Sequence, residues 1–556
     1  MDKTKIKNFA VNAHKELIDS VRQRLANFGI DKTGIADELP ISTVAVKYYN
    51  NEHFPLKGKA IDWRNQIVSR LNQDTNQEWG EKLNRFIEEV AYTWFNRIIA
   101  IRFMEVNDYL PSRTRVLSSE EGWVEPDMVT HALEIEDDLG GYSDEERAQV
   151  TEALTSHNPT QLDKVFRMLF IKQTDELSNL LPGLFEKTSD YMKLLFVPNY
   201  NNGVIKELVD EISEENFDVS KSGQVSILGW LYQYYISDEK NRDMSQPKSV
   251  KFNSKQIYEV TQIFTPDWIV KYMVQDSLGK YWIHHLQNTV NDSEKELAEK
   301  FGWKYYIPDG KQNAEISNRI RVLNKQEDIN SIEAIKVIDP ACGSGHILVY
   351  MFDLLMDIYL SEGYSQREAS RLIINNNLYG LEVDKRAYQL SYFAVMMKWR
   401  QFDRRAFSRN DRLHIHCFVN IDNVLTSIDV LKPILSNDDY DSVLRLIEAI
   451  RNANVLGSLL ILPDKEETNL DKYKDDVRIQ NSFEAQYVFG RLNDAVKACN
   501  ALITKYNCVV ANPPYMSSAR MNDTLTKYAS KYYPDSKRDL FAMFMERWTT
   551  QNVKGG

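Results

Sequence analysis

The chain has 556 residues, of which 43% are hydrophobic, and its formal net charge is −12 at pH 7. This length predicts about three globular domains, and because no apolar run is long enough to cross a bilayer, we expect a cytoplasmic protein without membrane contact. The four cysteines form no CxxC pair, which argues against a zinc ribbon or a disulfide framework, and the acidic charge confines any phosphate contact to local basic patches.

The amino-terminal region is predicted to be mostly helical. Apolar residues recur at helical spacing over residues 8–28, and a longer helix that begins near Leu83 is apolar on most of its sides, as expected for the central helix of a bundle. On that helix, Arg97 and Arg102 are expected to be satisfied charges at the surface of the domain. We predict three parts: a helical segment 1–60, a helical domain 61–250, and a third domain 251–556 with helical insertions at about 284–331 and 427–501.

The third domain opens with a helix-start signal. Thr265 is a good N-cap residue, Pro266 suits the first helical position, and Asp267 complements the positive end of the helix dipole. The sequence therefore predicts a helix from this point to about residue 281. These residues alone indicate no more than a well-capped helix.

A glycine-rich turn follows the first predicted strand of this domain. The strand, 335–339, leads into Asp-Pro-Ala-Cys-Gly-Ser-Gly at 339–345, and an apolar helix is predicted at 346–360. This order predicts the first strand-loop-helix step of a doubly wound sheet. The turn has neither the lysine of a P-loop nor the G-x-G-x-x-G spacing, so it favours a ligand with a small charged end and no phosphate.

The next two predicted strands supply acidic candidates. At the end of strand 378–384, Glu382 is the first choice for accepting ribose hydroxyl protons and Asp384 is the second. Their distance from the glycine-rich turn points away from NAD. A third strand, at about 414–419, precedes Asp422, which could hold the amine of an adenine ring or be an ordinary solvated residue.

The most informative stretch is Val-Val-Ala-Asn-Pro-Pro-Tyr at 509–515. A predicted strand, 506–511, ends there in a rigid turn. Asn512 offers a side-chain oxygen, the two prolines lack N–H groups and leave their carbonyls as acceptors, and Tyr515 adds a flat face. Two acceptors beside an aromatic ring suit a planar group that carries an NH₂, such as a nucleobase amine or a carboxamide.

Together these motifs resemble a known family. The turn 339–345 followed by the turn 512–515 is similar to the S-adenosylmethionine-dependent amino methyltransferases of DNA adenine, in their gamma-type order. Phe-Thr-Pro at 264–266 resembles their cofactor-binding helix start. Residues 380–384 resemble their ribose strand, and residues 539–546 resemble the helix that follows their catalytic turn.

The resemblance implies an α/β fold, namely a Rossmann-like class I methyltransferase sheet preceded by a mostly α-helical region. We expect this sheet to be incomplete at its C-terminal end, because only four central strands precede Gly556 and the strand before Asn512 would be an exposed edge. The helical stretch 91–106 also resembles the adenine methyltransferases of the type 1 BREX phage-defence system. This likeness implies double-stranded DNA and other phage-defence subunits as partners.

The same resemblance implies a role for each motif. A flipped adenine would stack on Tyr515, while the Asn512 side-chain oxygen and the Pro513 carbonyl accept hydrogen bonds from its N6 amine, and no metal is required. The implied catalytic residues are Asn512, Pro513, Pro514 and Tyr515. The residues implied to bind S-adenosylmethionine are Thr265, Pro266, Asp339, Pro340, Ala341, Cys342, Gly343, Gly345, Glu382 and Asp384.

Two other functions remain open from the sequence. The Asn-Pro-Pro-Tyr turn also resembles enzymes that methylate a glutamine carboxamide in protein release factors, although these would not need the long helical region in front. The third reading is a cofactor-sensing or DNA-docking subunit of a defence assembly, with little catalysis of its own. The sequence does not separate that binding role from catalysis.

Overall fold

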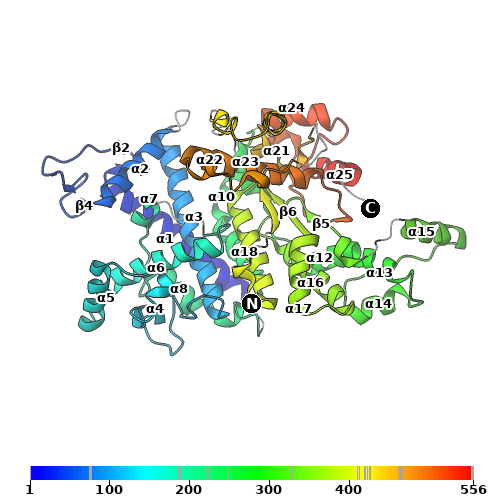
Figure 1. The fold of residues 1–556 in the computed structure, drawn as a ribbon, viewed down its shortest axis with the longest axis horizontal. Coiled ribbons are helices and arrows are strands. Elements are labelled where there is room, and N and C mark those ends of the chain that lie inside the picture. The colour runs from blue at the N-terminus through cyan, green and yellow to red at the C-terminus, as the bar shows by residue number, and fades with distance from the viewer. Residues whose placement is uncertain are drawn as a thin grey trace. The chain divides into compact units, whose positions relative to one another are not determined.

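A computed structural model describes residues 2–73, 78–185, 190–221, 224–247, 250–326, 329, 331–409, 411, 413–418, 421, 424, 427–462 and 468–551. The chain divides into two compact units, Met1–Asp238 and Glu239–Gly556, and each is described by itself (Figure 1). Among these residues, no helix combines the length and the apolar character needed to cross a bilayer.

The first unit is built almost entirely of helices, as predicted. Helix α3 (Trp79–Val106) is buried along most of its length because its apolar side chains point in nearly all directions, and α1 (Lys3–Asn27) packs against it. The other helices are α2 (Lys59–Gln73), α4 (Asp127–Thr130), α5 (Asp144–Ser156), α6 (Pro159–Leu180), α7 (Asp190–Leu194), α8 (Gly203–Glu211) and α9 (Ile227–Tyr235). Two short antiparallel pairs join β1 (Ile30–Asp31) to β2 (Gly34–Ile35) and β3 (Val46–Lys47) to β4 (Leu56–Lys57).

The expected surface position of Arg97 and Arg102 is wrong. Both side chains are buried, and Arg102 is only 1% exposed. The Arg102 guanidinium donates to Glu105 Oε1 at 2.6 Å and to Glu214 Oε1 at 3.2 Å. Glu105 also accepts hydrogen bonds from the backbone amides of Val116 and Leu117, each at 2.8 Å. The helix therefore carries its charge inside the unit, where paired carboxylates offset the cost of removing it from water.

The second unit is organised around a four-stranded parallel sheet with the order β7-β6-β5-β8. The strands are β5 (Val337–Asp339), β6 (Leu378–Glu382), β7 (His414–Cys417) and β8 (Cys508–Val509). Residue Ile338 of β5 pairs with Tyr379 on one side and with Val509 on the other. All four lie within the predicted strands, so the α/β character of this region is confirmed.

Helices cover both faces of this sheet, as parallel sheets require. On one face, Ile338, Tyr379 and Leu381 point into a core that includes side chains of α23 (Phe483–Ile503) and α25 (Leu540–Gln551). On the other, α16 (His346–Ser361) and α18 (Lys385–Phe402) pack against the strands. Gly380 has no side chain there, and a Cβ would lie 2.9 Å from Leu348 Cδ1 of α16. The glycine lets helix and sheet approach closely.

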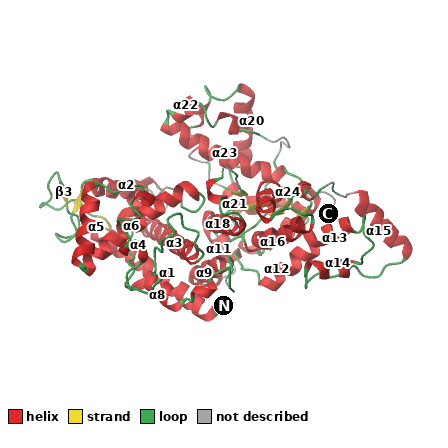
Figure 2. Ribbon diagram, turned by 60° about the horizontal axis from the view of Figure 1, so that its bottom comes forward, coloured by secondary structure: helices red, strands yellow, loops and turns green. Residues whose placement is uncertain are grey.

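The second unit contains further helices before, between and after these elements along the chain. The helix predicted from residue 266 is α12 (Asp267–Val274), continued by the π-helical turn η3 (Gln275–Gly279) and α13 (Lys280–Leu286). The described parts of residues 284–331 and 427–501 contain several helices, and Figure 2 shows α20 (Asn437–Ala449), α22 (Val477–Gln480) and α23 grouped together. The other helices of the second unit are α10 (Ser237–Met244), α11 (Ser254–Thr261), α14 (Glu294–Phe301), α15 (Ala314–Gln326), α17 (Gln366–Leu372), α21 (Ala453–Leu456) and α24 (Asp523–Tyr532).

The buried charge pair of α3 gives a test of the first unit. Replacing Glu105 by Gln should lower the free energy of unfolding of this unit by about 3 kcal/mol, because it removes the fully buried one of the two carboxylates that pair with Arg102. Denaturant titration followed by circular dichroism measures the change. The matched control is Asp19→Asn, which removes the exposed partner of Arg22 and should cost less than about 1 kcal/mol. Equal effects of the two substitutions would contradict this account.

Candidate active site

Three of the predicted motifs lie at the carboxyl edge of the sheet. Strand β5 leads into the glycine-rich loop, β6 ends at Glu382, and β8 leads into the turn 512–515. Because β5 pairs directly with both β6 and β8, these three chain segments leave the sheet side by side. The Val510 amide extends this pairing by donating to the Ile338 carbonyl at 3.0 Å.

Glu382 ties the glycine-rich loop to the end of β6. Its Oε2 accepts a hydrogen bond from the Gly343 amide at 2.7 Å, and its Oε1 accepts from the amides of Val383 and Asp384 at 2.9 and 3.0 Å. Burial raises the pKa of Glu382 to about 7, although the hydrogen bonds from the backbone oppose this change. Oε1 thus accepts two hydrogen bonds and Oε2 accepts one, so Oε2 retains one lone pair that can accept from a ligand.

Asp339 is a second buried carboxyl group, directly beneath the loop. It is 1% exposed, and its Oδ1 accepts from the Ala341 amide at 3.0 Å. Its Oδ2 is buried without a hydrogen-bond partner among the residues that the structure describes. Burial raises the pKa of Asp339 to about 8, and the nearby Glu382 acts in the same direction. Asp339 is therefore largely protonated at neutral pH.

The two glycines of the loop have different surroundings. Gly345 has a φ of +86°, and a Cβ there would lie 2.8 Å from the Ser391 Cα of α18. Gly343 has a φ of +53°, and a Cβ there would meet no atom within 4 Å. Gly345 thus allows the close packing of loop and helix, whereas Gly343 faces open space. The Cys342 amide holds the loop by donating to the Leu381 carbonyl at 3.0 Å, and the Ser458 hydroxyl donates to the Pro340 carbonyl.

The turn 512–515 presents a polar amide and an exposed ring. Asn512 Nδ2 donates to Thr265 Oγ1 at 3.0 Å and lies 3.4 Å from the Ile263 carbonyl oxygen. No donor among the described residues occupies the Asn512 side-chain oxygen, which remains an acceptor. Tyr515 is 52% exposed, and its ring centroid lies 5.9 Å from that of Phe541. This places a hydrogen-bond acceptor next to an accessible aromatic ring.

The predicted capping role of Thr265 is wrong. Pro266 occupies the N-cap position of α12, and no side chain caps the helix there. The Thr265 hydroxyl instead accepts the hydrogen bond from Asn512, and the Thr265 carbonyl accepts from His346 Nδ1 at 3.0 Å. The physical reason is that a tertiary partner, 247 residues away, takes the hydroxyl that local rules assign to the helix end.

His346, which the sequence analysis did not assign to the site, supports Thr265. The imidazole of His346 stacks on the ring of Phe264, with centroids 4.3 Å apart and an interplanar angle of 15°. On its other side, His346 Nε2 lies 3.9 Å from Asp267 Oδ1, and His346 and Lys271 hold the pKa of Asp267 at about 2. The available signal was the place of His346, which directly follows Gly345 and begins α16.

Of the two remaining predicted acidic residues, the structure describes Asp384. Asp384 is the N-cap of α18, and its Oδ1 accepts from the Arg386 amide at 3.0 Å. Its Oδ2 accepts from Gln262 Nε2 at 2.9 Å, which ties the segment before Thr265 to the end of β6. Asp422 lies outside the described residues.

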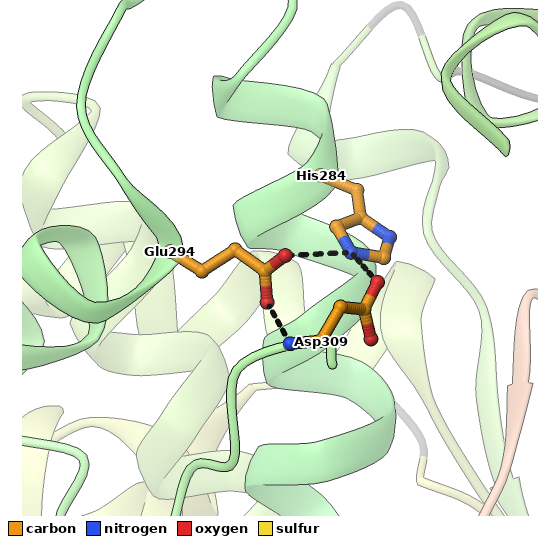
Figure 3. A group of neighbouring side chains, drawn as sticks. All are labelled: His284, Glu294 and Asp309. Atoms are coloured by element: carbon orange, nitrogen blue, oxygen red, sulfur yellow. Dashed lines mark hydrogen bonds and ion pairs between the residues drawn. The ribbon is translucent and has the colours of Figure 1, made fainter. Parts of the chain in front are cut away.

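A second group of titratable side chains lies away from this site, where His284 of α13, Glu294 of α14 and Asp309 come together (Figure 3). His284 Nε2 is 3.9 Å from Glu294 Oε1 and 3.5 Å from Asp309 Oδ2. However, Asp309 Oδ1 already pairs with the Lys280 ammonium at 2.7 Å, and Glu294 Oε2 accepts from the Tyr306 hydroxyl at 2.7 Å. These contacts account for the group as an ion-pair network within the first insertion.

Two family models match the second unit. The model described as "Eco57I restriction-modification methylase" matches residues 376–556, which include Glu382 and the turn 512–515. The model described as "MmeI, DNA-methyltransferase domain" matches residues 313–434, which include the glycine-rich loop. The matched regions together contain all three strand ends of the candidate site.

Whole-chain relatives extend this match to the first unit. An adenine-specific methyltransferase PglX of Lacticaseibacillus casei (strain Zhang) is 44% identical over 560 residues, which cover 98% of this chain. The resemblance to adenine-specific methyltransferases is confirmed. An adenine-specific methyltransferase BrxX of Escherichia coli O9:H4 (strain HS) is 34% identical over 575 residues, again covering 98% of this chain. The chain spans 45% of the length of both PglX and BrxX.

Solved structures show only a distant likeness. A DrdV–DNA complex studied by cryoEM aligns with 90% of this chain and 38% of its own, at 12% identity and a TM-score of 0.27. A score this low carries no argument about function.

The buried Asp339 carboxyl predicts a pH dependence. A carboxyl whose pKa is raised on folding stabilises the fold below its unfolded value, about 4, and this contribution is lost as the pH rises through about 8. Asp339→Asn keeps the oxygen that accepts from Ala341 but cannot ionise. We therefore expect the melting temperature of the wild type to fall more steeply than that of the variant between pH 5 and pH 8. If the melting temperatures of the two proteins change in parallel with pH, a buried ionisable carboxyl group at this position is contradicted.

Proposed function

We propose that the protein is an S-adenosylmethionine-dependent methyltransferase that modifies the N6 amine of adenine in double-stranded DNA. The observation that carries this proposal is that the glycine-rich loop and the turn 512–515 follow adjacent parallel strands, with the Asn512 amide held by a hydrogen bond to Thr265. The similarity to PglX and BrxX over nearly the whole chain supports the same reaction. We further propose that the parallel sheet is a Rossmann-like class I methyltransferase sheet.

The residues at the end of β5 and β6 fit the proposed cofactor. Gly343 is open on the side where a Cβ would point, so its backbone is accessible to a ligand. Glu382 adds an acceptor oxygen, Oε2, at the end of the neighbouring strand, where it can accept a hydrogen bond from a ribose hydroxyl group. S-adenosylmethionine, when bound, supplies an electrophilic methyl group. Asp339 and Asp384 act one step removed in this proposal, because their hydrogen bonds shape the two chain segments that contact the ligand.

The turn 512–515 provides what an adenine amine needs. Flipping the base from the duplex costs a few kcal/mol, and stacking on the exposed Tyr515 ring offsets part of that cost. The Asn512 side-chain oxygen and the Pro513 carbonyl accept hydrogen bonds from the two N6–H groups and direct the nitrogen lone pair toward the methyl group. Asn512 is neutral, so it orients the amine and stabilises its developing positive charge, and proton loss follows transfer. Proximity and orientation supply most of the remaining catalysis.

The cellular role proposed here rests on the resemblance to BREX adenine methyltransferases. The protein would act in the cytoplasm, where it would mark host DNA as part of a phage-defence assembly with other subunits. The names PglX and BrxX of the two relatives agree with this role.

Asn512 provides the direct test of the reaction. Asn512→Ala should lower adenine methylation by about 100-fold or more, because removing one preorganised hydrogen-bonding group at a reacting centre has an effect of this size. Mapping of N6-methyladenine in the genome of cells that carry the wild-type gene, the variant or no gene measures the loss. Asn481→Ala, at an exposed position in the second insertion, is the matched control and should keep full methylation.

Two further measurements on the same cells, of release-factor methylation and of phage restriction, would redirect the proposal. Methylation of a release-factor glutamine instead of adenine would assign the protein to the glutamine methyltransferases. Phage restriction that persists in the Asn512→Ala variant, after its methylation is lost, would make DNA or cofactor binding the primary role.

Tyr515 tests the stacking step separately. Tyr515→Phe keeps the ring and should bind DNA with nearly wild-type affinity, whereas Tyr515→Ala should weaken binding by roughly 5- to 100-fold, since base stacking on an aromatic ring contributes about 1–3 kcal/mol. Binding is measured by fluorescence anisotropy of an end-labelled DNA duplex that carries the target adenine. An alanine variant that binds this duplex with the same affinity as the wild type would exclude Tyr515 as the stacking surface.

A further inference from the structure

The hydrogen bond between Asn512 and Thr265 has a consequence for the chemistry of the turn. A carboxamide carries an acceptor on one side and a donor on the other, and a half-turn about its last side-chain bond exchanges them. Only one of the two orientations offers an oxygen to an incoming amine. Some group of the protein must therefore select it.

The surroundings of Asn512 make this selection. Two oxygens lie near its amide nitrogen, the Thr265 hydroxyl at 3.0 Å and the Ile263 carbonyl at 3.4 Å. A carbonyl can only accept, so the pair favours the nitrogen at this position and disfavours the oxygen. The side-chain oxygen then points away from the 263–265 segment.

The Thr265 hydroxyl is itself held in place. The residue is 8% exposed, and its carbonyl accepts a hydrogen bond from His346 Nδ1 at 3.0 Å. His346 makes this contact through the edge of its imidazole, and the ring of Phe264 stacks on the imidazole face. Because His346 directly follows Gly345, this contact links the position of the Thr265 hydroxyl to the glycine-rich loop. A chain of contacts thus runs from that loop through His346 and Thr265 to Asn512.

We propose that Thr265 is a positioning residue for the methyl transfer, and that its hydroxyl, acting with the Ile263 carbonyl, holds the Asn512 carboxamide in the orientation that accepts from adenine N6. This inference rests on the proposed function and deepens it. It differs from the cofactor contact that the sequence resemblance implies for Thr265. A cofactor contact acts mainly on the binding of S-adenosylmethionine, whereas a positioning role acts on the rate of transfer once both substrates are bound.

The test compares Thr265→Val, which has nearly the same shape but no hydroxyl, with Thr265→Ser, which keeps it. We expect the valine variant to lower kcat about tenfold, the change that corresponds to one net hydrogen bond, while KM for S-adenosylmethionine stays within about twofold. The serine variant should recover most of kcat. Thr261→Val is the matched control, because within the described part of the chain the Thr261 hydroxyl bonds to carbonyls of its own helix α11 alone, and it should leave kcat unchanged.

A double-mutant cycle separates positioning from general structural damage. In the Asn512→Ala background, Thr265→Val should cause no further loss in single-turnover methyl transfer, because the amide that Thr265 orients is absent. Independent, additive losses in the two variants would overturn the inference. It is also overturned if Thr265→Val keeps kcat or raises only KM. A wild-type protein that transfers no methyl group to adenine would instead overturn the proposed function, and the inference with it.

Discussion

The candidate site depends on the parallel pairing of β5 with a strand on each side. Strands that run in the same direction end at the same edge of a sheet, so the chain segments that follow them emerge together. The contact between β5 and β8 is reinforced at its start by Asn507, whose side-chain oxygen accepts from the Lys336 amide at 2.9 Å and whose backbone amide donates to the Lys336 carbonyl at 2.8 Å. This double contact fixes the register of β8 against β5, so that the segment carrying Asn512 and the glycine-rich loop leave the sheet from adjacent strands.

The ionisation of Asp339 and Glu382 is controlled by burial rather than by ion pairs. Burial raises the pKa of both Glu382 and Asp339 toward or above neutrality, so the loop carries less negative charge than its sequence suggests. A cationic ligand beside Glu382 would favour the ionised form of that side chain. In the first unit, by contrast, the buried Arg102 guanidinium is paired with two carboxylates. Buried charge is thus neutralised at the candidate site and paired in the helical unit.

Much of the sheet and of the site edge could be predicted from the sequence. The strands are short apolar runs that end in polar or glycine-rich residues, and this pattern is local, so β5, β6, β7 and β8 all fall within the predicted ranges. The glycine-rich loop and the turn 512–515 follow adjacent strands, which agrees with the resemblance that assigns one motif to the cofactor and the other to the adenine. The helical nature of the two insertions was also readable from composition.

What the sequence could not provide are contacts made between distant segments. The rules for helix caps consider only neighbours in the chain, so they gave Thr265 to α12 and could not see Asn512. The same limit applied to Arg102, whose partner Glu214 lies 112 residues away. His346 was passed over because a histidine at the start of a helix has no distinctive local pattern, and its value comes from the stacked ring of Phe264.

The long insertion before β8 bears on how the sheet assembles during folding. Gly343 and Glu382, which join the loop to β6, are 39 residues apart, whereas Lys336 and Asn507 are separated by 171. Closing the longer segment costs about 1 kcal/mol more in chain entropy, and it must wait until the intervening helices have been synthesised. On a ribosome, the part that surrounds Glu382 can therefore become native first, and the Asn-Pro-Pro-Tyr segment joins a partner strand that is already in place.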